Sequence, residues 1–275
     1  MRCRWMFVLP VLVLGIAACG SVRTPAPAVV PSRTQSAAPT APMSPSTSAR
    51  PSAPASPSAS ARPSAPTSPP ASASQLLQPG MSGPAVAQLQ RRLAALAYYP
   101  GPVDGQFGTD TLEAVWAFQE VQGLPAQDVV DAAMQRALAN PRPPAVLVPG
   151  DGSPRIEINL ADEVLVLYRD SQISLISHVS TGGGYYYCSP GGGCGYAITP
   201  VGDFTTTTFM PGWVTVPLGE MYNPVFFIDT AYAIHGDTYV PLQPVSHGCV
   251  RIPMDIARFF HTLVPTPGTP VYIRN

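Results

Sequence analysis

The sequence predicts a multidomain protein in which a small all-α domain and a mostly-β domain follow a long disordered segment. Three observations support this fold class. Residues 19–75 consist almost entirely of alanine, proline, serine and threonine, and such a segment has too little apolar surface to offset the entropy lost on folding. Apolar residues recur with a helical period after residue 76. After residue 154 their period changes to two, as in β-strands.

The first 18 residues have the pattern of an export signal. Arg2 and Arg4 precede an apolar run over residues 7–18, which is shorter than the ~20 residues that a membrane-spanning helix needs. Residues 16–20 resemble a bacterial lipobox. This resemblance implies that Cys19 receives lipid and anchors the exported chain to the outer face of the bacterial cell membrane, facing the cell wall. A plain secretory signal and a buried hydrophobic start are the alternatives.

The charge balance excludes one class of partner. The formal net charge is −1, and only 11% of the 275 residues are charged. This composition offers no polycationic surface for nucleic acid, so we expect no nucleic-acid partner.

Residues 76–140 predict three short helices. Apolar spacing places the first over residues 86–96 and the second over 110–118, where acidic residues of the first turn are expected to form the cap. The third, over 134–138, is the least regular. Proline-rich residues 141–153 then predict a linker between the two domains.

This helical segment resembles the three-helix peptidoglycan-binding module. The residues that carry the resemblance are Gly80, Gly83, Val86, Leu89, Gln90, Leu93, Asp104, Gly105, Phe107, Gly108, Ala114, Val115, Phe118, Gln119, Gly123 and Leu124. Most of the apolar ones are expected to be core. The resemblance implies a wall-binding role, in which Tyr98, Tyr99 and Gln106 are candidates for a groove that takes glycan.

Residues 154–275 predict the β-rich domain. The alternating pattern favours strands over residues 156–160, 164–168, 173–179, 204–208, 225–228 and 271–273. In this domain only residues 254–263 have a helical apolar face.

A cysteine and two histidines lie close together in residues 234–251. These are His235, His247 and Cys249. A thiol is nucleophilic as its thiolate, and a neighbouring imidazole is a common means of activating it. Papain-like proteases place the cysteine before the histidine, so this order indicates a different Cys-His chemistry.

The motif is similar to the signature of L,D-transpeptidases. The similarity lies in Ile234 to Gly236 and in Ser246 to Arg251, and residues 180–182 and 199–204 resemble two further landmarks. It covers residues 154–274 and implies a mixed β-sandwich. The implied activity is the cross-linking of peptidoglycan stem peptides through a cysteine thioester, at the carbonyl of the diamino acid before the terminal D-Ala. It also implies inhibition by carbapenem-type β-lactams.

Four residues of the motif receive catalytic roles in this hypothesis. Cys249 attacks the carbonyl and His235 moves the proton. The Gly236 carbonyl orients the imidazole, and the N–H groups of Gly248 and Cys249 face the developing oxyanion. No cofactor is expected, and the spacings match none of the usual zinc sites.

The neighbouring polar residues leave alternatives open. His247 either positions the site or transfers a proton, and Ser246 either bonds an imidazole or fills a turn. Arg251 either binds a substrate carboxylate or forms a structural salt bridge. His178 and His261 lie outside the motif and are predicted to be ordinary surface or core residues.

Two further cysteines, Cys188 and Cys194, flank a flexible Ser-Pro-Gly-Gly-Gly loop. Such a loop can bring two Cα atoms within the ~6 Å of a disulfide. Pairing them leaves Cys249 as a free thiol, whereas free thiols and a metal contact are the other possibilities.

Three alternative functions also fit the sequence. Water could replace the amine acceptor, which would make the chain an L,D-carboxypeptidase or an amidase. A non-catalytic wall-binding lipoprotein and a general secreted cysteine peptidase are the other two.

Overall fold

The computed structural model describes residues 76–150 and 152–275. The expected signal, the lipidation of Cys19 and the disordered linker over residues 19–75 lie outside these ranges. Within them, no helix combines the length and the apolar character that a membrane span requires.

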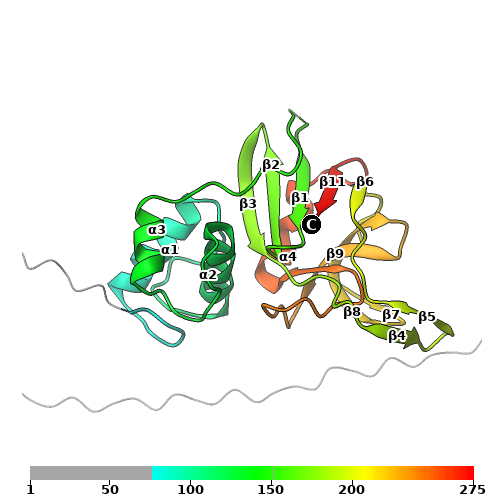
Figure 1. Cartoon of the computed structure of the whole chain (residues 1–275), viewed down its shortest axis with the longest axis horizontal. Helices are drawn as coiled ribbons and strands as arrows, with labels where there is room; N and C mark the ends of the chain where they lie inside the picture. Colours follow the sequence, from blue (N-terminus) through cyan, green and yellow to red (C-terminus); the bar gives the residue numbers. More distant parts are fainter. Residues whose placement is uncertain (1–75, 151) are drawn as a thin grey trace, which may run out of the picture. The chain divides into compact units, whose positions relative to one another are not determined.

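Three helices pack together at the start of the described chain (Figure 1). They are α1 (Pro84–Ala95), α2 (Thr109–Gln122) and α3 (Ala132–Ala139). Helix α2 begins after Gly108 without a side-chain cap, so the predicted acidic cap is wrong. In α3 the Asp131 side chain instead accepts a hydrogen bond from the Met134 N–H, which satisfies one of the free donors of the first turn.

The helices enclose an apolar core that includes one of the predicted groove residues. Leu93, Val115 and Phe118 are fully buried. Tyr98 is 4% exposed, and its ring meets the Phe118 ring edge-on at 5.5 Å. Tyr98, one of the three candidates for a binding groove, is therefore a core residue.

The other two groove candidates lie in different surroundings. The ring of Tyr99 packs edge-on against the ring of Phe259 in the β domain, with 4.9 Å between the centroids. Gln106 remains exposed, so of the three candidates it is the one that a ligand could reach most freely.

Two larger sheets and a hairpin form the β domain (Figure 1). Their elements are β1 (Arg155–Asn159), β2 (Val164–Arg169), β3 (Gln172–His178), β4 (Tyr186–Ser189), β5 (Gly193–Tyr196), β6 (Gly202–Thr205), β7 (Trp213–Val216), β8 (Gly219–Ile228), β9 (Tyr232–Asp237), β10 (Val250–Pro253), α4 (Met254–Leu263) and β11 (Pro270–Arg274). One sheet has the order β3-β2-β1-β11-β6 and the other β10-β9-β8-β7, while β4 pairs with β5.

The two larger sheets share one hydrophobic core. Ile156 and Leu165 of the first sheet belong to the same buried cluster as Val225 and Ile234 of the second. The pairs β1–β11 and β9–β10 are parallel and the other pairs are antiparallel. The predicted mixed β-sandwich is confirmed.

Strand β2 is buried on both faces, which the sequence did not predict. Leu165 and Leu167 face the sandwich core. Val164, Val166 and Tyr168 alternate with them and belong to the buried cluster of the three helices. The helical domain therefore completes its core on the outer face of the five-stranded sheet.

Candidate active site

The parallel pairing of β9 and β10 brings the histidine and the cysteine of the motif to one face of a sheet. Val250 lies opposite Ile234, and Arg251 lies opposite His235. Val250 and Ile234 are fully buried in the sandwich core. Cys249 directly precedes β10. Because side chains alternate along a strand, Cys249, His235 and Arg251 are displayed away from that core.

Cys249 and His235 both line a groove of about 850 Å³. The β4–β5 hairpin borders it through Gly193 and Gly195, and the β7–β8 hairpin borders it through Trp213, among other residues. Tyr187 of the β4–β5 hairpin also lines the groove, so this wall includes an aromatic ring as well as the two glycines.

A disulfide joins the two strands of the β4–β5 hairpin. Cys188 lies directly opposite Cys194 in the ladder, and their sulfur atoms are bonded. Cys249 is the free cysteine of the described residues. A thiol is thus left available on the groove.

His235 is held as a neutral base with a defined tautomer. Its ring is buried, and Nδ1 lies 3.0 Å from the Gly236 carbonyl oxygen. A carbonyl only accepts, so Nδ1 carries the proton. Burial lowers the pKa of His235, although the bond to Gly236 opposes this effect. Nε2 is therefore unprotonated near neutral pH and free to accept a proton.

The Cys249 thiol is also neutral in the resting site. Its Sγ donates to the Ala231 carbonyl oxygen at 3.8 Å, and burial raises the pKa of Cys249 above its ordinary value of 9.0. No hydrogen bond links Sγ to His235 in the part of the chain that the structure describes. The expected enrichment of thiolate is thus absent, so a nucleophilic role for Cys249 would require its proton to be removed as the sulfur reacts.

Ser246 fixes the turn that presents the cysteine. Its Oγ donates to the Cys249 carbonyl oxygen at 2.6 Å and accepts from the Gly248 N–H at 2.9 Å. The Gly248 N–H is therefore occupied, and its expected role as an oxyanion donor is wrong for this conformation. The Cys249 N–H remains the candidate donor.

Gly248 is needed at this turn for steric reasons. Its φ is +132°, and a Cβ built there would lie 2.7 Å from both the Ile198 carbonyl oxygen and the Tyr232 ring. Thr199 Oγ1 donates to the Gly248 carbonyl oxygen at 2.8 Å. Any larger residue would therefore have to displace Ile198 or Tyr232.

Gly236 is confined in the same way. A Cβ built on it would lie 2.6 Å from that of Ala257. The absence of a side chain lets helix α4 pack closely against the strand that carries His235, and the Gly236 carbonyl stays in place to orient the imidazole.

The imidazole of His247 contacts the disulfide-closed hairpin and the segment leading into it. Its ring meets the rings of Tyr187 at 4.7 Å and Tyr185 at 5.5 Å, both nearly perpendicular. Burial lowers the pKa of His247. These contacts favour a positioning role for His247 over proton transfer.

Arg251 forms a salt bridge within the groove. Its Nε lies 3.1 Å from Asp237 Oδ2, and its Nη1 donates to the Tyr239 carbonyl oxygen at 3.5 Å. Asp237, at the end of β9, was not among the predicted site residues. Its partner Arg251 had been given this structural role as one of two alternatives.

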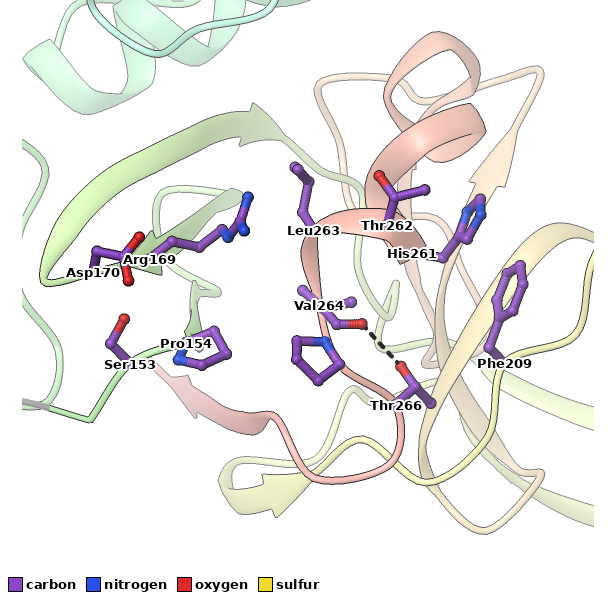
Figure 2. Close-up of a pocket in the computed structure, with 11 residues that line it drawn as sticks. Ser153, Pro154, Arg169, Asp170, Phe209, His261, Thr262, Leu263, Val264 and Thr266 are labelled. Carbon is purple, nitrogen blue, oxygen red and sulfur yellow. Dashed lines mark hydrogen bonds between the residues drawn. The ribbon is translucent and has the colours of Figure 1, made fainter.

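A second cavity, of about 460 Å³, lies away from the motif and is shown in Figure 2. The rings of Phe209 and His261 stack there at 4.3 Å, and Arg169 lines the same cavity. It contains no residue of the Cys-His motif, whereas Cys249 and His235 line the larger groove. Among residues 76–150 and 152–275, no group of three or more histidine, cysteine or acidic side chains is arranged to hold a metal ion.

Comparison with protein families gives two matches. Residues 82–138 match the putative peptidoglycan binding domain, and residues 153–273 match the L,D-transpeptidase catalytic domain. The crystal structure of an L,D-transpeptidase (residues 123–326) from Xylanimonas cellulosilytica is 35% identical, with a TM-score of 0.67. The similarity covers 75% of this chain and 100% of that one.

Curated relatives match over short segments. A spore cortex-lytic enzyme of Bacillus cereus is 42% identical over 65 residues, which are 24% of this chain and 25% of the relative. The N-acetylmuramoyl-L-alanine amidase XlyA of Bacillus subtilis is 47% identical over 58 residues, 19% of this chain and 20% of the relative. The chain thus matches only a quarter or less of the length of these relatives.

Proposed function

Because the chain belongs to the L,D-transpeptidase family, we propose that it joins peptidoglycan stem peptides by acyl transfer through a thioester on Cys249. The observation that carries the proposal is the free Cys249 thiol on one groove with His235, whose Nδ1 is bonded to Gly236 and whose Nε2 can accept a proton. The family and the match to a peptidoglycan binding domain support this substrate class.

The first half of the reaction forms the thioester. His235 Nε2 takes the thiol proton as Cys249 Sγ bonds to the carbonyl carbon of the diamino acid in a donor stem tetrapeptide. The Cys249 N–H stabilises the negative charge on the carbonyl oxygen. The C–N bond to the terminal D-Ala then breaks, and the proton on Nε2 passes to the departing amine.

The second half transfers the acyl group. The side-chain amine of an acceptor stem attacks the thioester carbon while Nε2 removes a proton from the nitrogen. The C–S bond breaks, and the proton returns to the sulfur. Both halves use one neutral thiol and one neutral imidazole in the resting enzyme, which agrees with the directions in which burial shifts the two pKa values.

The parts of the chain suit a cell-wall enzyme. We propose that lipid on Cys19 holds the exported protein at the outer face of the membrane, that residues 19–75 give it reach, and that the helical domain engages glycan. A carbapenem, whose strained amide carbonyl is open to attack by sulfur, is expected to acylate Cys249.

Product masses test the proposal. We expect the full chain, given a stem tetrapeptide and an acceptor carrying a free side-chain amine, to release D-Ala and produce the mass of the joined peptides. Release of D-Ala with only the hydrolysed tripeptide would instead identify a carboxypeptidase. Cleavage of ordinary all-L peptides at comparable rates would identify a general peptidase, and either outcome would overturn transfer as the main reaction.

A further inference from the structure

A buried histidine connects the helical domain to the loop that precedes the active-site cysteine. His178 ends strand β3, and its side chain is fully inaccessible to solvent. Its Nδ1 lies 2.8 and 3.1 Å from the two carboxyl oxygens of Glu120 on helix α2. Its Nε2 lies 3.2 Å from the Pro241 carbonyl oxygen. The Trp116 ring, also from α2, lies nearly perpendicular to the imidazole, with 5.5 Å between the ring centroids.

The proton positions on His178 follow from its partners. Nε2 must carry a proton, because the Pro241 carbonyl can only accept. One further proton lies between Nδ1 and the Glu120 carboxyl group, whether the pair is ionic or neutral. Burial raises the pKa of Glu120 to about 7, and the hydrogen bond to His178 opposes this rise. Both bonds of the imidazole therefore persist in either form of the pair.

The loop held by Pro241 leads directly into the turn that carries Cys249. The segment that follows β3 forms further hydrogen bonds with this loop. Ser180 Oγ donates to the Gln243 carbonyl oxygen at 2.8 Å, and the Val245 N–H donates to Ser180 Oγ at 3.2 Å. The N–H of the next residue then bonds the Thr181 carbonyl oxygen at 2.9 Å. The bond from the imidazole to Pro241 is the first of these attachments along the loop.

We propose that His178 is a positioning residue, which ties Glu120 of the helical domain to the Pro241 carbonyl and so makes that domain part of the active-site scaffold. Ser246, at the end of the same loop, holds the turn that carries Cys249. A loop released at Pro241 would let this turn move relative to the catalytic histidine. The expected loss is therefore in the rate of the chemical step, with little effect on the affinity for a ligand in the groove.

Two substitutions separate the two bonds of the imidazole. All variants are made in the full chain. In His178→Gln, the side-chain amide extends to the position that Nε2 occupies in the wild type and keeps the hydrogen bond to the Pro241 carbonyl oxygen. The shorter His178→Asn keeps a donor near Nδ1 for Glu120 and loses Pro241. Glu120→Ala removes the helical partner, and Arg91→Ala, on the exposed face of α1, is the matched control.

The readout is the rate at which a carbapenem acylates Cys249. The rate is monitored by the intact mass of the folded fraction of each variant. We expect His178→Asn, which loses the Pro241 bond, to lower the maximal acylation rate by about tenfold, the worth of one hydrogen bond. Glu120→Ala keeps that bond and loses only the helical partner, as His178→Gln does, so its rate should fall no further than that of His178→Gln. The half-saturating concentration should stay within about twofold, and His178→Gln and Arg91→Ala should retain the rate to within about threefold.

The inference rests on the proposed nucleophile, and the outcomes separate the two. A wild-type chain that forms no adduct would overturn the proposed function. A reactive wild type with equal maximal rates in His178→Asn and His178→Gln would overturn the positioning role alone. Lower melting temperatures without any loss of rate would assign His178 to stability and would likewise overturn it.

Discussion

Replacing Cys249 with alanine is expected to abolish acyl transfer, lowering kcat/KM by at least about 10⁴-fold. The thiol is the attacking atom in both the formation and the release of the proposed thioester, and it is the free cysteine of the described residues. Without its sulfur the thioester cannot form. The measurement is the rate of D-Ala release from a stem tetrapeptide.

This loss should occur without a change of fold. Cys249 is only half-buried, so alanine leaves a small gap at the edge of the groove, and the melting temperature should shift by no more than a few degrees. An alanine variant that releases D-Ala at the wild-type rate would show that the β domain is not the source of the activity. The non-catalytic wall-binding alternative would then be favoured.

Replacing His235 with glutamine is expected to lower kcat/KM by about 10²–10⁴-fold at neutral pH, the usual contribution of a general base. Burial raises the pKa of the Cys249 thiol above 9.0, so the variant has little thiolate at neutral pH. Its rate should therefore increase by about tenfold for each pH unit up to that pKa. The wild type needs a neutral His235. Because burial lowers the pKa of this histidine, the wild-type enzyme should keep its rate to below pH 6.5.

The matched control is His261→Gln, a histidine of the same domain that stacks on Phe209 away from the groove. We expect this control to keep the wild-type pH profile. A His235→Gln variant with the wild-type profile, reduced by a constant factor at every pH, would mean that His235 acts only through structure.

The sequence predicted the elements that have a regular apolar period and missed several others. Helix α4 was predicted over residues 254–263, as observed, because its apolar face has an unbroken period. Strands β9 and β10 were missed, and only residues 225–228 of β8 were predicted. Strands β4, β5 and β7, which have four residues each, were also missed. Their residues are exposed or half-buried, so no alternation between a buried and a solvated face marks them.

The sequence predicted residues that line the groove, but it did not predict the contacts that these residues make within it. Cys249 and His235 stand out because their residue types and order indicate Cys-His chemistry. Asp237 and Tyr187 also line the groove, yet neither lies in a recognisable motif. The bond between Ser246 Oγ and the backbone N–H two residues later was not foreseen either, because it depends on the local turn geometry.

His178 shows the limit of a local interpretation. It was predicted to be an ordinary residue, and nothing beside it in the sequence indicates otherwise. Its partners Glu120 and Pro241 are 58 and 63 residues away. Only the packing of the helices on the sheet brings the three groups together. Such long-range contacts are set by tertiary structure and leave no short-range signal.

The central claim is that Cys249 carries the acyl group, and trapping the intermediate tests it most directly. The full chain would be mixed with a stem tetrapeptide in the absence of an amine acceptor, quenched in acid, and its intact mass and peptide map recorded. We predict a mass gain equal to the donor minus D-Ala, located on Cys249. Turnover of the donor with the acyl group on another residue would contradict the account.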